Sequence, residues 1–187
     1  MNKPQTKKYD VATLAAGCFW CTETIFKRLK GIVSVKPGYT GGITENPTYE
    51  EVLTGTTGHA EAIQIKFKPS IISYEQILDV FWNVHDPTTL NRQGNDIGTN
   101  YRSAIFYHTN MQRDIAFKSL NNLKKKRIYK NRIVTQIIPF SYFYDAENYH
   151  RNYFENNSKN TYCSLVISPK LDKFSKKYSA LIKKDYR

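Results

Sequence analysis

Residues 9–31, YDVATLAAGCFWCTETIFKRLKG, join a strand pattern directly to a helix pattern through a single glycine. Residues 9–16 alternate in polarity and then become wholly apolar, which is typical of a strand that enters a core. After Gly17 the apolar spacing changes to that of one helical face, and Gly31 supplies a left-handed stop for the helix. We therefore expect a strand over 9–16 and a helix that begins at Cys18.

The segments that follow continue this alternation of strands and helices. A short β-branched strand is expected at 32–35, then a Gly-rich loop, and then an alternating strand over 60–67. Ser73 and Gln76 form a capping box for a second helix, from which a long polar loop leads to a strand at 103–107. This order predicts an α+β fold, a two-layer α/β sandwich with a ferredoxin-like (split βαβ) core. Beyond the core, the pattern predicts a helix over 112–126, a strand over 133–138 and an amphipathic piece over 146–154.

Length and composition indicate one domain. The chain has 187 residues, 40% of them hydrophobic, which is enough for one core and too few for two. We expect a single domain over 1–187, with a disordered N-terminus at 1–8 and a basic helical tail at 170–187. No apolar stretch is long enough to span a membrane, and the apolar run at 11–16 is too short for a signal peptide. A cytoplasmic monomer without a membrane partner is the expectation.

The strong positive charge raises the question of nucleic-acid binding. The net charge is +12, from 28 Lys and Arg against 16 Asp and Glu. The densest basic runs, 124–127 and the tail at 170–187, alternate with apolar residues as surface helices do. Basic runs alone carry little specificity, so solvated helix surfaces are the favoured interpretation and no nucleic-acid partner is expected. A basic nucleic-acid-binding module stays an alternative, and it would show steeply salt-sensitive binding.

Two of the three cysteines lie in GCFWCTE, residues 17–23. The first, Cys18, stands where the predicted helix begins, and free N–H groups with the positive helix end lower a thiol pKa, often by one to several units from about 8.5. Cys18 is therefore the candidate nucleophile. Cys21 follows one helical turn later, within reach of Cys18 for a disulfide. Three cysteines are too few for a secreted disulfide framework and suit thiols that are reduced between turnovers.

Besides a catalytic role, this cysteine pair could belong to a zinc site, a thioredoxin-type active site or the core. A structural zinc site needs four ligands, and Cys163 with scattered histidines offers no second close pair, so no metal is expected. A dithiol oxidoreductase of the thioredoxin type fits the helix start, but the bulky Phe-Trp pair would crowd a surface that docks on a partner's disulfide. Spacing alone leaves redox catalysis and a buried pair of core cysteines equally open.

Several stretches together resemble the A-type peptide methionine sulfoxide reductases. After GCFWCTE come GYTGGITENPTYEEVLTG, TGHAEAIQI, HDPTTLNRQGNDIGTNYRSAIFY, FYDAENYHRNYF and YCSLVISPKLDKF, in the family's order and spacing over residues 9–175. The resemblance implies a single catalytic domain that reduces methionine (S)-sulfoxide, protein-bound or free, and so repairs oxidative damage. It also implies that thioredoxin returns the electrons and that no cofactor is needed.

The resemblance assigns the chemical steps to particular side chains. Cys18 matches the nucleophile, which becomes a sulfenic acid, and Glu61 matches the acid that protonates the departing oxygen. A carboxyl held among apolar groups has a raised pKa and stays protonated near neutrality. Tyr49 and Tyr101 match tyrosines that hydrogen bond to the sulfoxide oxygen. Without the resemblance, Glu61 would be interpreted as a strand glutamate that faces water.

Substrate-binding roles follow in the same way. Phe19 and Trp20 match the aromatic wall that holds the methyl group of the substrate, although rings at these positions also suit plain core packing. Asp96, in GNDIG, matches a residue that orients the substrate, and its alternative is an ordinary turn aspartate. Asn100 stands where the family usually has glutamine.

The sequence departs from the commoner family pattern in the cysteines that would reduce the oxidised Cys18. Many members have glycine at the position of Cys21 and recycle through cysteines in a C-terminal tail, whereas the tail here has none. The resolving thiol is therefore Cys21, Cys163 or an outside thiol. We favour Cys21, because its proximity on the same helix makes the attack intramolecular without loop movement. Cys163 is the alternative.

Overall fold

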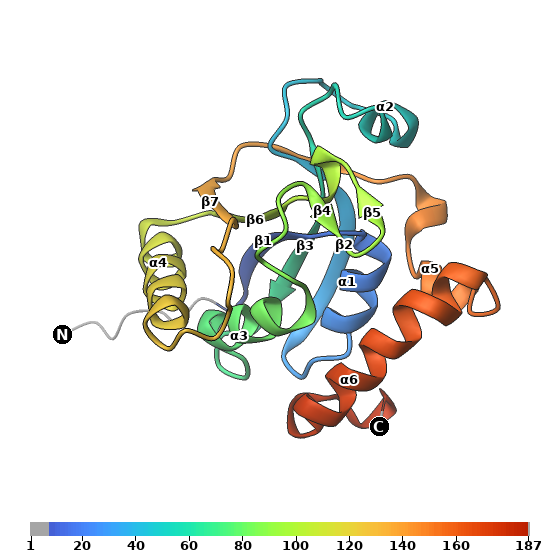
Figure 1. Cartoon of the computed structure of the whole chain (residues 1–187). Coiled ribbons are helices and arrows are strands. Elements are labelled where there is room, and N and C mark those ends of the chain that lie inside the picture. The colour runs from blue at the N-terminus through green and yellow to red at the C-terminus, as the bar shows by residue number, and fades with distance from the viewer. Residues whose placement is uncertain (1–7, 187) are drawn as a thin grey trace.

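A six-stranded sheet forms the centre of the molecule in the computed structural model, which describes residues 8–186 (Figure 1). In sheet order the strands are β7 (Gln136–Pro139), β6 (Ser103–Tyr107), β1 (Asp10–Ala16), β3 (Ala60–Phe67), β2 (Ile32–Thr40) and β8 (Phe143–Asp145). The four central strands β6, β1, β3 and β2 pair antiparallel, β8 joins β2 antiparallel and β7 joins β6 in parallel. The central order confirms the predicted α+β fold with a split βαβ core.

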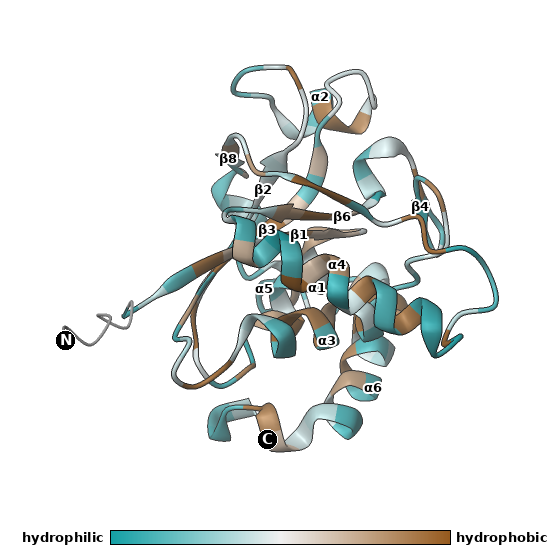
Figure 2. Ribbon diagram, turned by 90° about the vertical axis from the view of Figure 1, so that its left-hand side faces the viewer, coloured by the Kyte–Doolittle hydropathy of each residue, from teal (hydrophilic) through white to brown (hydrophobic). Residues whose placement is uncertain are grey.

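The longer helices lie together on one face of this sheet, so the two-layer arrangement is visible from the side (Figure 2). They are α1 (Phe19–Phe26), α3 (Tyr74–Val84), α4 (Asn110–Lys125) and α6 (Ser168–Tyr178). Two short helices, α2 (Tyr49–Leu53) and α5 (Tyr153–Asn156), stand at its margins (Figure 1). A small hairpin of β4 (Arg92–Gln93) and β5 (Asp96–Ile97), a 3-10 turn at Thr99–Tyr101 and a π-helical turn at Cys163–Ile167 complete the surroundings of α1. No helix of residues 8–186 is both long enough and apolar enough to cross a membrane.

Alternation along the strands divides the core between the two faces of the sheet. Leu14 of β1 and Ile63 and Ile65 of β3 face the helices and join the main core cluster. Ala15, Ala62 and neighbouring small residues face the other way and are covered by Ile138, Phe140 and Phe143. Because Glu61 has the same parity as Ile63, its side chain belongs to the helix-covered face.

Several expected elements are confirmed by the structure. The strands at 60–67 and 103–107 have the expected bounds, and the first strand differs by one residue at its start. Helix α3 begins with the reciprocal capping box of Ser73 and Gln76. Helix α4 covers Asn110–Lys125 where 112–126 was expected, and α6 begins just before the expected basic tail at 170–187 and ends at Tyr178. The expectation of disorder at the N-terminus lies almost entirely outside the described residues.

Other segments differ from the expectation. Strand β2 does not stop at 35 but continues to Thr40, because β3 pairs with it to that residue and β8 pairs with its last three residues. The Gly-rich loop contains helix α2, which Thr48 and Glu51 start with their own capping box. Helix α1 ends at Phe26, and the strand expected over 133–138 is β7, which begins at Gln136. The amphipathic piece at 146–154 is a 3-10 turn followed by the start of α5.

Candidate functional site

The junction between β1 and α1 fixes the backbone of Cys18. Gly17 has φ +83°, in the left-handed region, and a Cβ on it would lie 2.6 Å from Cβ of Gln93. A glycine is therefore required for the chain to turn from the sheet into the helix while β4 packs against it. Cys18 is the residue that caps α1, and its side chain is 7% exposed. The thiol is thus almost fully buried where β1 meets α1.

Glu61 lies beneath the first turn of α1 and is 1% exposed. Its Oε2 accepts the backbone N–H of Phe19 at 3.1 Å, and its Oε1 has no hydrogen-bond partner among residues 8–186. Burial raises the pKa of the Glu61 carboxyl to about 8; the Phe19 N–H and the nearby Asn100 side chain act against the rise, and the neighbouring acids Asp96 and Cys21 add to it. Glu61 is therefore a neutral acid at pH 7 with one buried oxygen left free.

Cys18 does not have the lowered pKa that a helix start predicts. Burial raises the pKa of its thiol well above the ordinary value, and Cys21 and Glu61 nearby act in the same direction. Burial is the main cause, and the Phe19 N–H at the helix start is in addition bound by Glu61 rather than free to stabilise a thiolate. Cys18 and Glu61 are thus both protonated in the substrate-free protein.

Aromatic rings line the site on the side of α1. The ring of Phe19, fully buried, lies 5.8 Å from that of Tyr39 and 6.3 Å from that of Tyr49, nearly parallel to the latter. Trp20 stacks on Tyr153 with 3.6 Å between centroids and 5° between planes, and its Nε1 donates to Nδ1 of His150 at 2.9 Å. Phe19 and Trp20 therefore have fixed orientations, as a wall for an apolar group requires.

Both predicted tyrosines lie close to the thiol and the acid. Burial raises the pKa of Tyr49, with further contributions from Glu61, Tyr101 and Cys18. Burial likewise raises the pKa of Tyr101, with contributions from Glu61, Cys18 and Asp96. Both phenols keep their protons near neutrality and can donate hydrogen bonds to an oxygen between them and Glu61.

Asp96 lies on the opposite side of the site, in the short hairpin of β4 and β5. Its Oδ2 accepts the hydroxyl proton of Tyr162 at 2.7 Å. The same hydroxyl oxygen lies 4.0 Å from Sγ of Cys21, so Asp96, Tyr162 and the second cysteine are contiguous. The Cys18 thiol beside it lowers the pKa of Cys21, and Lys170 acts in the same direction.

All three cysteines are reduced and belong to one buried cluster with Ile167. Cys163 is fully buried at the start of the π-helical turn, and burial raises the pKa of its thiol. Cys21 and Cys163 therefore both lie near Cys18, but only Cys21 shares its helix and has a lowered pKa. Among residues 8–186, no three His, Cys, Asp or Glu side chains are grouped as metal ligands.

Sequence reasoning did not single out the residues that hold the aromatic wall in place. His150, fully buried, is packed between Phe19 and Tyr49 with centroid distances of 4.9 and 4.4 Å. Glu147 accepts the hydroxyl of Tyr39 at 2.7 Å and the backbone N–H of Tyr49 at 2.8 Å. Both residues lie in FYDAENYHRNYF, a stretch that already carries the family resemblance, and this was the one sequence signal for them. Their partners are about 100 residues away in sequence, so only the fold shows these contacts.

Every residue predicted for the site is thus gathered around the start of α1. A thiol, a neutral carboxylic acid, two phenols and an aromatic wall can together bind a polar oxygen on one side and a small apolar group on the other. Such a site suits attack by sulfur on a substrate from which an oxygen departs with a proton.

Known proteins are similar to this chain over most of its length. The family model for peptide methionine sulfoxide reductase matches residues 10–182. A peptide methionine sulfoxide reductase MsrA of Saccharolobus solfataricus is 56% identical over 174 residues, 93% of this chain and 97% of that protein. Among solved structures, reduced Mxr1 from Saccharomyces cerevisiae aligns with TM-score 0.78 and 36% identity over 87% of this chain and 92% of that one. The structure of Mxr1 from the same yeast in complex with Trx2 aligns with TM-score 0.57 and 29% identity, over 82% of this chain and 90% of that one.

Proposed function

Since this chain belongs to the peptide methionine sulfoxide reductase family, we propose that residues 1–187 form one catalytic domain in which Cys18 attacks the sulfoxide. The activity is that of a peptide-methionine (S)-S-oxide reductase, a thiol-dependent enzyme that returns methionine (S)-sulfoxide, protein-bound or free, to methionine. The observation that carries the proposed mechanism is the pairing of Cys18 with Glu61, a fully buried carboxyl with a pKa of about 8.

Glu61 is the proton donor in this mechanism. Its free Oε1 is the atom we assign to the sulfoxide oxygen, because a buried polar atom without a partner gains most from a hydrogen-bonding ligand. A neutral carboxylic acid donates a proton as the S–O bond breaks, which a carboxylate cannot do. Tyr49 and Tyr101 donate further hydrogen bonds to the same oxygen, so negative charge that develops there is stabilised.

The first half-reaction balances without any other reactant. The Cys18 thiol and the sulfoxide give a cysteine sulfenic acid and methionine: the oxygen moves to the Cys18 sulfur, and two electrons pass from that sulfur to the methionine sulfur. Glu61 gives its proton to the oxygen and receives the proton of the Cys18 thiol. The raised pKa of Cys18 fits this order, because the thiol proton leaves during the reaction rather than before it.

Phe19 and Trp20 hold the methyl group of the substrate by apolar contact. Their fixed orientation, through Tyr49 on one ring and Tyr153 and His150 on the other, supports this role. Asp96 with Tyr162 forms the polar side of the site and orients the substrate. Together the two sides would sort one sulfoxide epimer from the other, because the methyl group and the oxygen must be bound at the same time.

Cys21 is the resolving thiol in our proposal. It attacks the Cys18 sulfenic acid, water is released and a disulfide between the two residues remains. Its place one turn along α1 supports this choice over Cys163, and the Lys170 charge, which also lowers the pKa of Cys21, remains when Cys18 is oxidised. Mapping the disulfide of the oxidised enzyme by mass spectrometry tests it: we expect Cys18 joined to Cys21, and a Cys18–Cys163 bond with Cys21 reduced would reject it.

Thioredoxin is the proposed reductant of this disulfide. The solved complex of yeast Mxr1 with Trx2 supports this proposal, because the Mxr1 chain in it aligns structurally with 82% of this chain. We further propose that the enzyme is a cytoplasmic monomer that needs no cofactor beyond thioredoxin and binds neither membranes nor nucleic acid. The substrates are oxidised proteins and free methionine sulfoxide.

One assay tests the proposed function against a general disulfide reductase. Thioredoxin-coupled consumption of each methionine sulfoxide epimer is measured for the wild type, Cys18→Ser and Glu61→Gln. We expect consumption of the S epimer only, none with Cys18→Ser, and a loss of about 10²–10⁴ in kcat with Glu61→Gln. A wild type that consumes neither epimer, or a Glu61→Gln variant with full activity, would contradict the proposal.

A further inference from the structure

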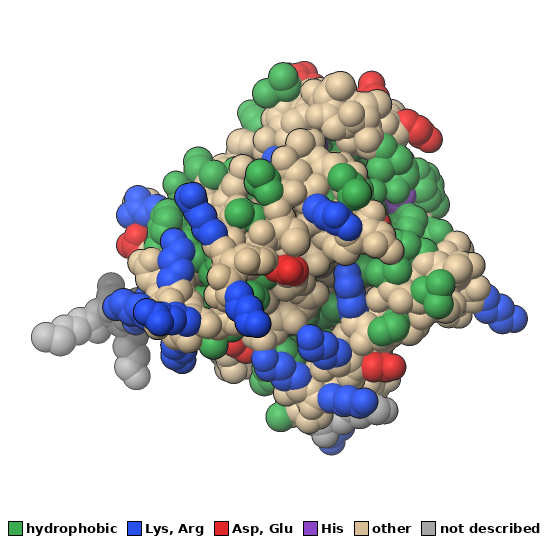
Figure 3. Space-filling view, in the orientation of Figure 1, with side chains coloured by type: hydrophobic (Ala, Val, Ile, Leu, Met, Phe, Trp, Pro, Cys, Tyr) green, Lys and Arg blue, Asp and Glu red, His purple; other side chains and the backbone are tan. Residues whose placement is uncertain are grey.

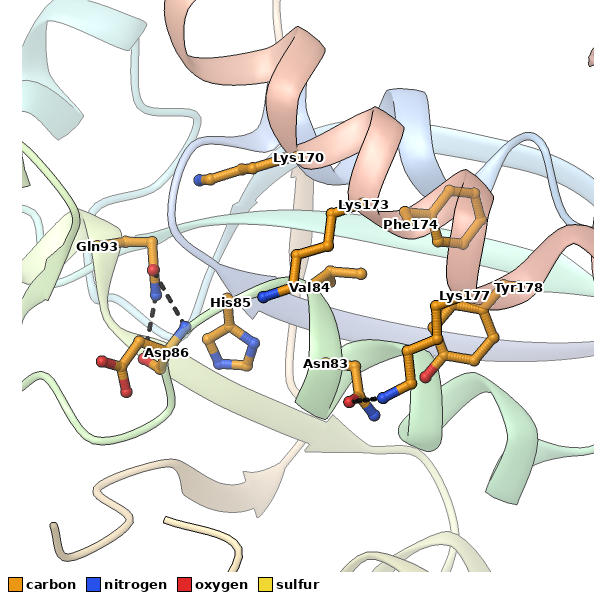
Figure 4. Close-up of a pocket in the computed structure, with 10 residues that line it drawn as sticks. All are labelled: Asn83, Val84, His85, Asp86, Gln93, Lys170, Lys173, Phe174, Lys177 and Tyr178. Carbon is orange, nitrogen blue, oxygen red and sulfur yellow. Dashed lines mark hydrogen bonds between the residues drawn. The ribbon is translucent and has the colours of Figure 1, made fainter. Parts of the chain in front are cut away.

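A cavity of about 420 Å³ lies outside the catalytic site, between the end of α3 and helix α6 (Figure 4). Its floor is the buried ring of His85, whose two nitrogens are bound to the carbonyl oxygen of Phe81 and the hydroxyl of Ser103. Burial lowers the pKa of His85 to about 4, so the floor is neutral at pH 7. Charge in this groove comes from the side chains at its rim.

The rim is strongly basic. Lys170, Lys173 and Lys177 project from α6 along one side of the groove, at the i, i+3, i+7 spacing of one helix face (Figure 4). Lys and Arg side chains are prominent over this part of the molecule (Figure 3). Within residues 8–186, no carboxylate forms an ion pair with any of these three lysines, and the Lys177 ammonium donates to Oδ1 of Asn83. The one carboxylate that lines the groove, Asp86, has its Oδ1 bound by Thr88.

The groove lies next to the polar edge of the catalytic site. Gln93 and Lys170 line both this cavity and a smaller one of about 230 Å³ that is also lined by Asp96 and Tyr162. Gln93 is held by two hydrogen bonds to the backbone of Asp86. The same Gln93 side chain packs against Gly17, the residue before Cys18. Gln93 and Lys170 therefore stand at the border between the basic groove and the edge of the site at Asp96.

We propose that this groove, which we call the lysine groove (Lys170, Lys173, Lys177 and Gln93), binds an acidic stretch of the substrate polypeptide next to the methionine sulfoxide. The inference rests on the proposed function, because it extends the same catalytic site. From Lys170 to Lys177 the helix rises about 10 Å, at 1.5 Å per residue. An extended peptide covers that length with about three residues, so two or three carboxylates can each lie near one ammonium group.

The test is a single-turnover measurement with enzyme that has been reduced and freed of reductant, so that thioredoxin plays no part. Four peptides are compared, each with one methionine (S)-sulfoxide. Two carry three glutamates, either before or after the sulfoxide, and two carry glutamines at the same places. The groove lies on one side of the site, so we expect about a tenfold faster second-order reaction for the acidic peptide in one orientation only.

Two charge reversals on the same helix separate the groove from the general positive field. Lys173→Glu removes a groove ammonium, and we expect the preference for the acidic peptide to fall at least about threefold. Lys176→Glu makes the same change in net charge at an exposed position that does not line the groove, and the preference should persist. High salt should reduce the wild-type preference.

Several results would overturn the inference. Equal rates for acidic and neutral peptides, equal preferences in both orientations, or equal effects of Lys173→Glu and Lys176→Glu would each do so. If Lys173→Glu instead raised only the KM for thioredoxin in steady-state assays, the groove would serve the reductant and the inference would be wrong. Loss of all turnover in the wild type, with free methionine sulfoxide included, would count against the proposed function itself.

Discussion

Replacing Glu61 by glutamine should inactivate the enzyme and stabilise its fold at the same time. The variant keeps the size of the side chain and an acceptor for the Phe19 N–H, but it removes the proton that the mechanism needs. It also removes a carboxyl that the folded protein must keep neutral. The two effects have the same origin, the burial of this carboxyl under α1.

The size of the stability effect follows from the raised pKa. Glu61 has a pKa of about 8 in the folded protein against an ordinary value of 4.5. Below pH 4.5 the carboxyl is protonated in both the folded and the unfolded protein, so it does not change the free energy of unfolding. As the pH rises from 4.5 to 8, the unfolded state loses the proton first, so the wild type loses about 1.4 kcal/mol of unfolding free energy per pH unit, about 5 kcal/mol in all. At pH 7 the cost is about 3 kcal/mol.

Urea unfolding of reduced protein between pH 5 and 8 measures this effect. The difference in unfolding free energy, Glu61→Gln minus wild type, should increase with pH by about 1.4 kcal/mol per unit and then level off near pH 8. Glu45→Gln changes an exposed glutamate and should give a difference close to zero throughout. A difference for Glu61→Gln that does not change with pH would refute the buried neutral acid.

Glu61, the ring stacked on Trp20 and the glycine before Cys18 each lead to a further prediction. Wild-type kcat/KM should decline above pH about 8, because the acid form of Glu61 is lost there, and a pH–rate profile with free methionine sulfoxide checks this. Tyr153→Ala removes the ring stacked on Trp20 and should lower kcat/KM about two- to tenfold, whereas Tyr153→Phe should retain it; steady-state kinetics decide. Gly17→Ala should destabilise the fold by about 1–3 kcal/mol in urea unfolding, since φ is +83° and the new Cβ would lie 2.6 Å from both Cβ and Cγ of Gln93.

Local patterns were sufficient for the elements that are stabilised locally. The β1–α1 junction was predictable because its strand period, glycine and helix period are consecutive in sequence, and α3 was predictable from its capping box. Helix α2 carried the same kind of signal in Thr48 and Glu51 and was overlooked within the Gly-rich loop. The end of β2 was not predictable, because it depends on pairing with the distant strands β3 and β8: a Cβ on Gly38 would lie 2.3 Å from the carbonyl oxygen of Tyr144.

The neutral state of Glu61 was predictable from the resemblance and its apolar neighbours, whereas the state of Cys18 was not. A helix start predicts a lowered pKa for Cys18, but burial raises it, and Glu61 binds the Phe19 N–H that a thiolate would use. His150 was considered only as a possible zinc ligand. Its contacts with Phe19, Trp20 and Tyr49 join segments 100 and more residues apart, which periodicity along the chain cannot reveal.

The central claim is that the Cys18 thiol alone takes the oxygen from the substrate. It is tested most directly with methionine (S)-sulfoxide labelled with ¹⁸O and a Cys21→Ser/Cys163→Ser variant, in which Cys18 is the one remaining cysteine. Without reductant, we predict one equivalent of methionine per enzyme and transfer of the label to the peptide that contains Cys18, seen by mass spectrometry. No methionine, or methionine formed while the label appears in water and not on Cys18, would contradict the account.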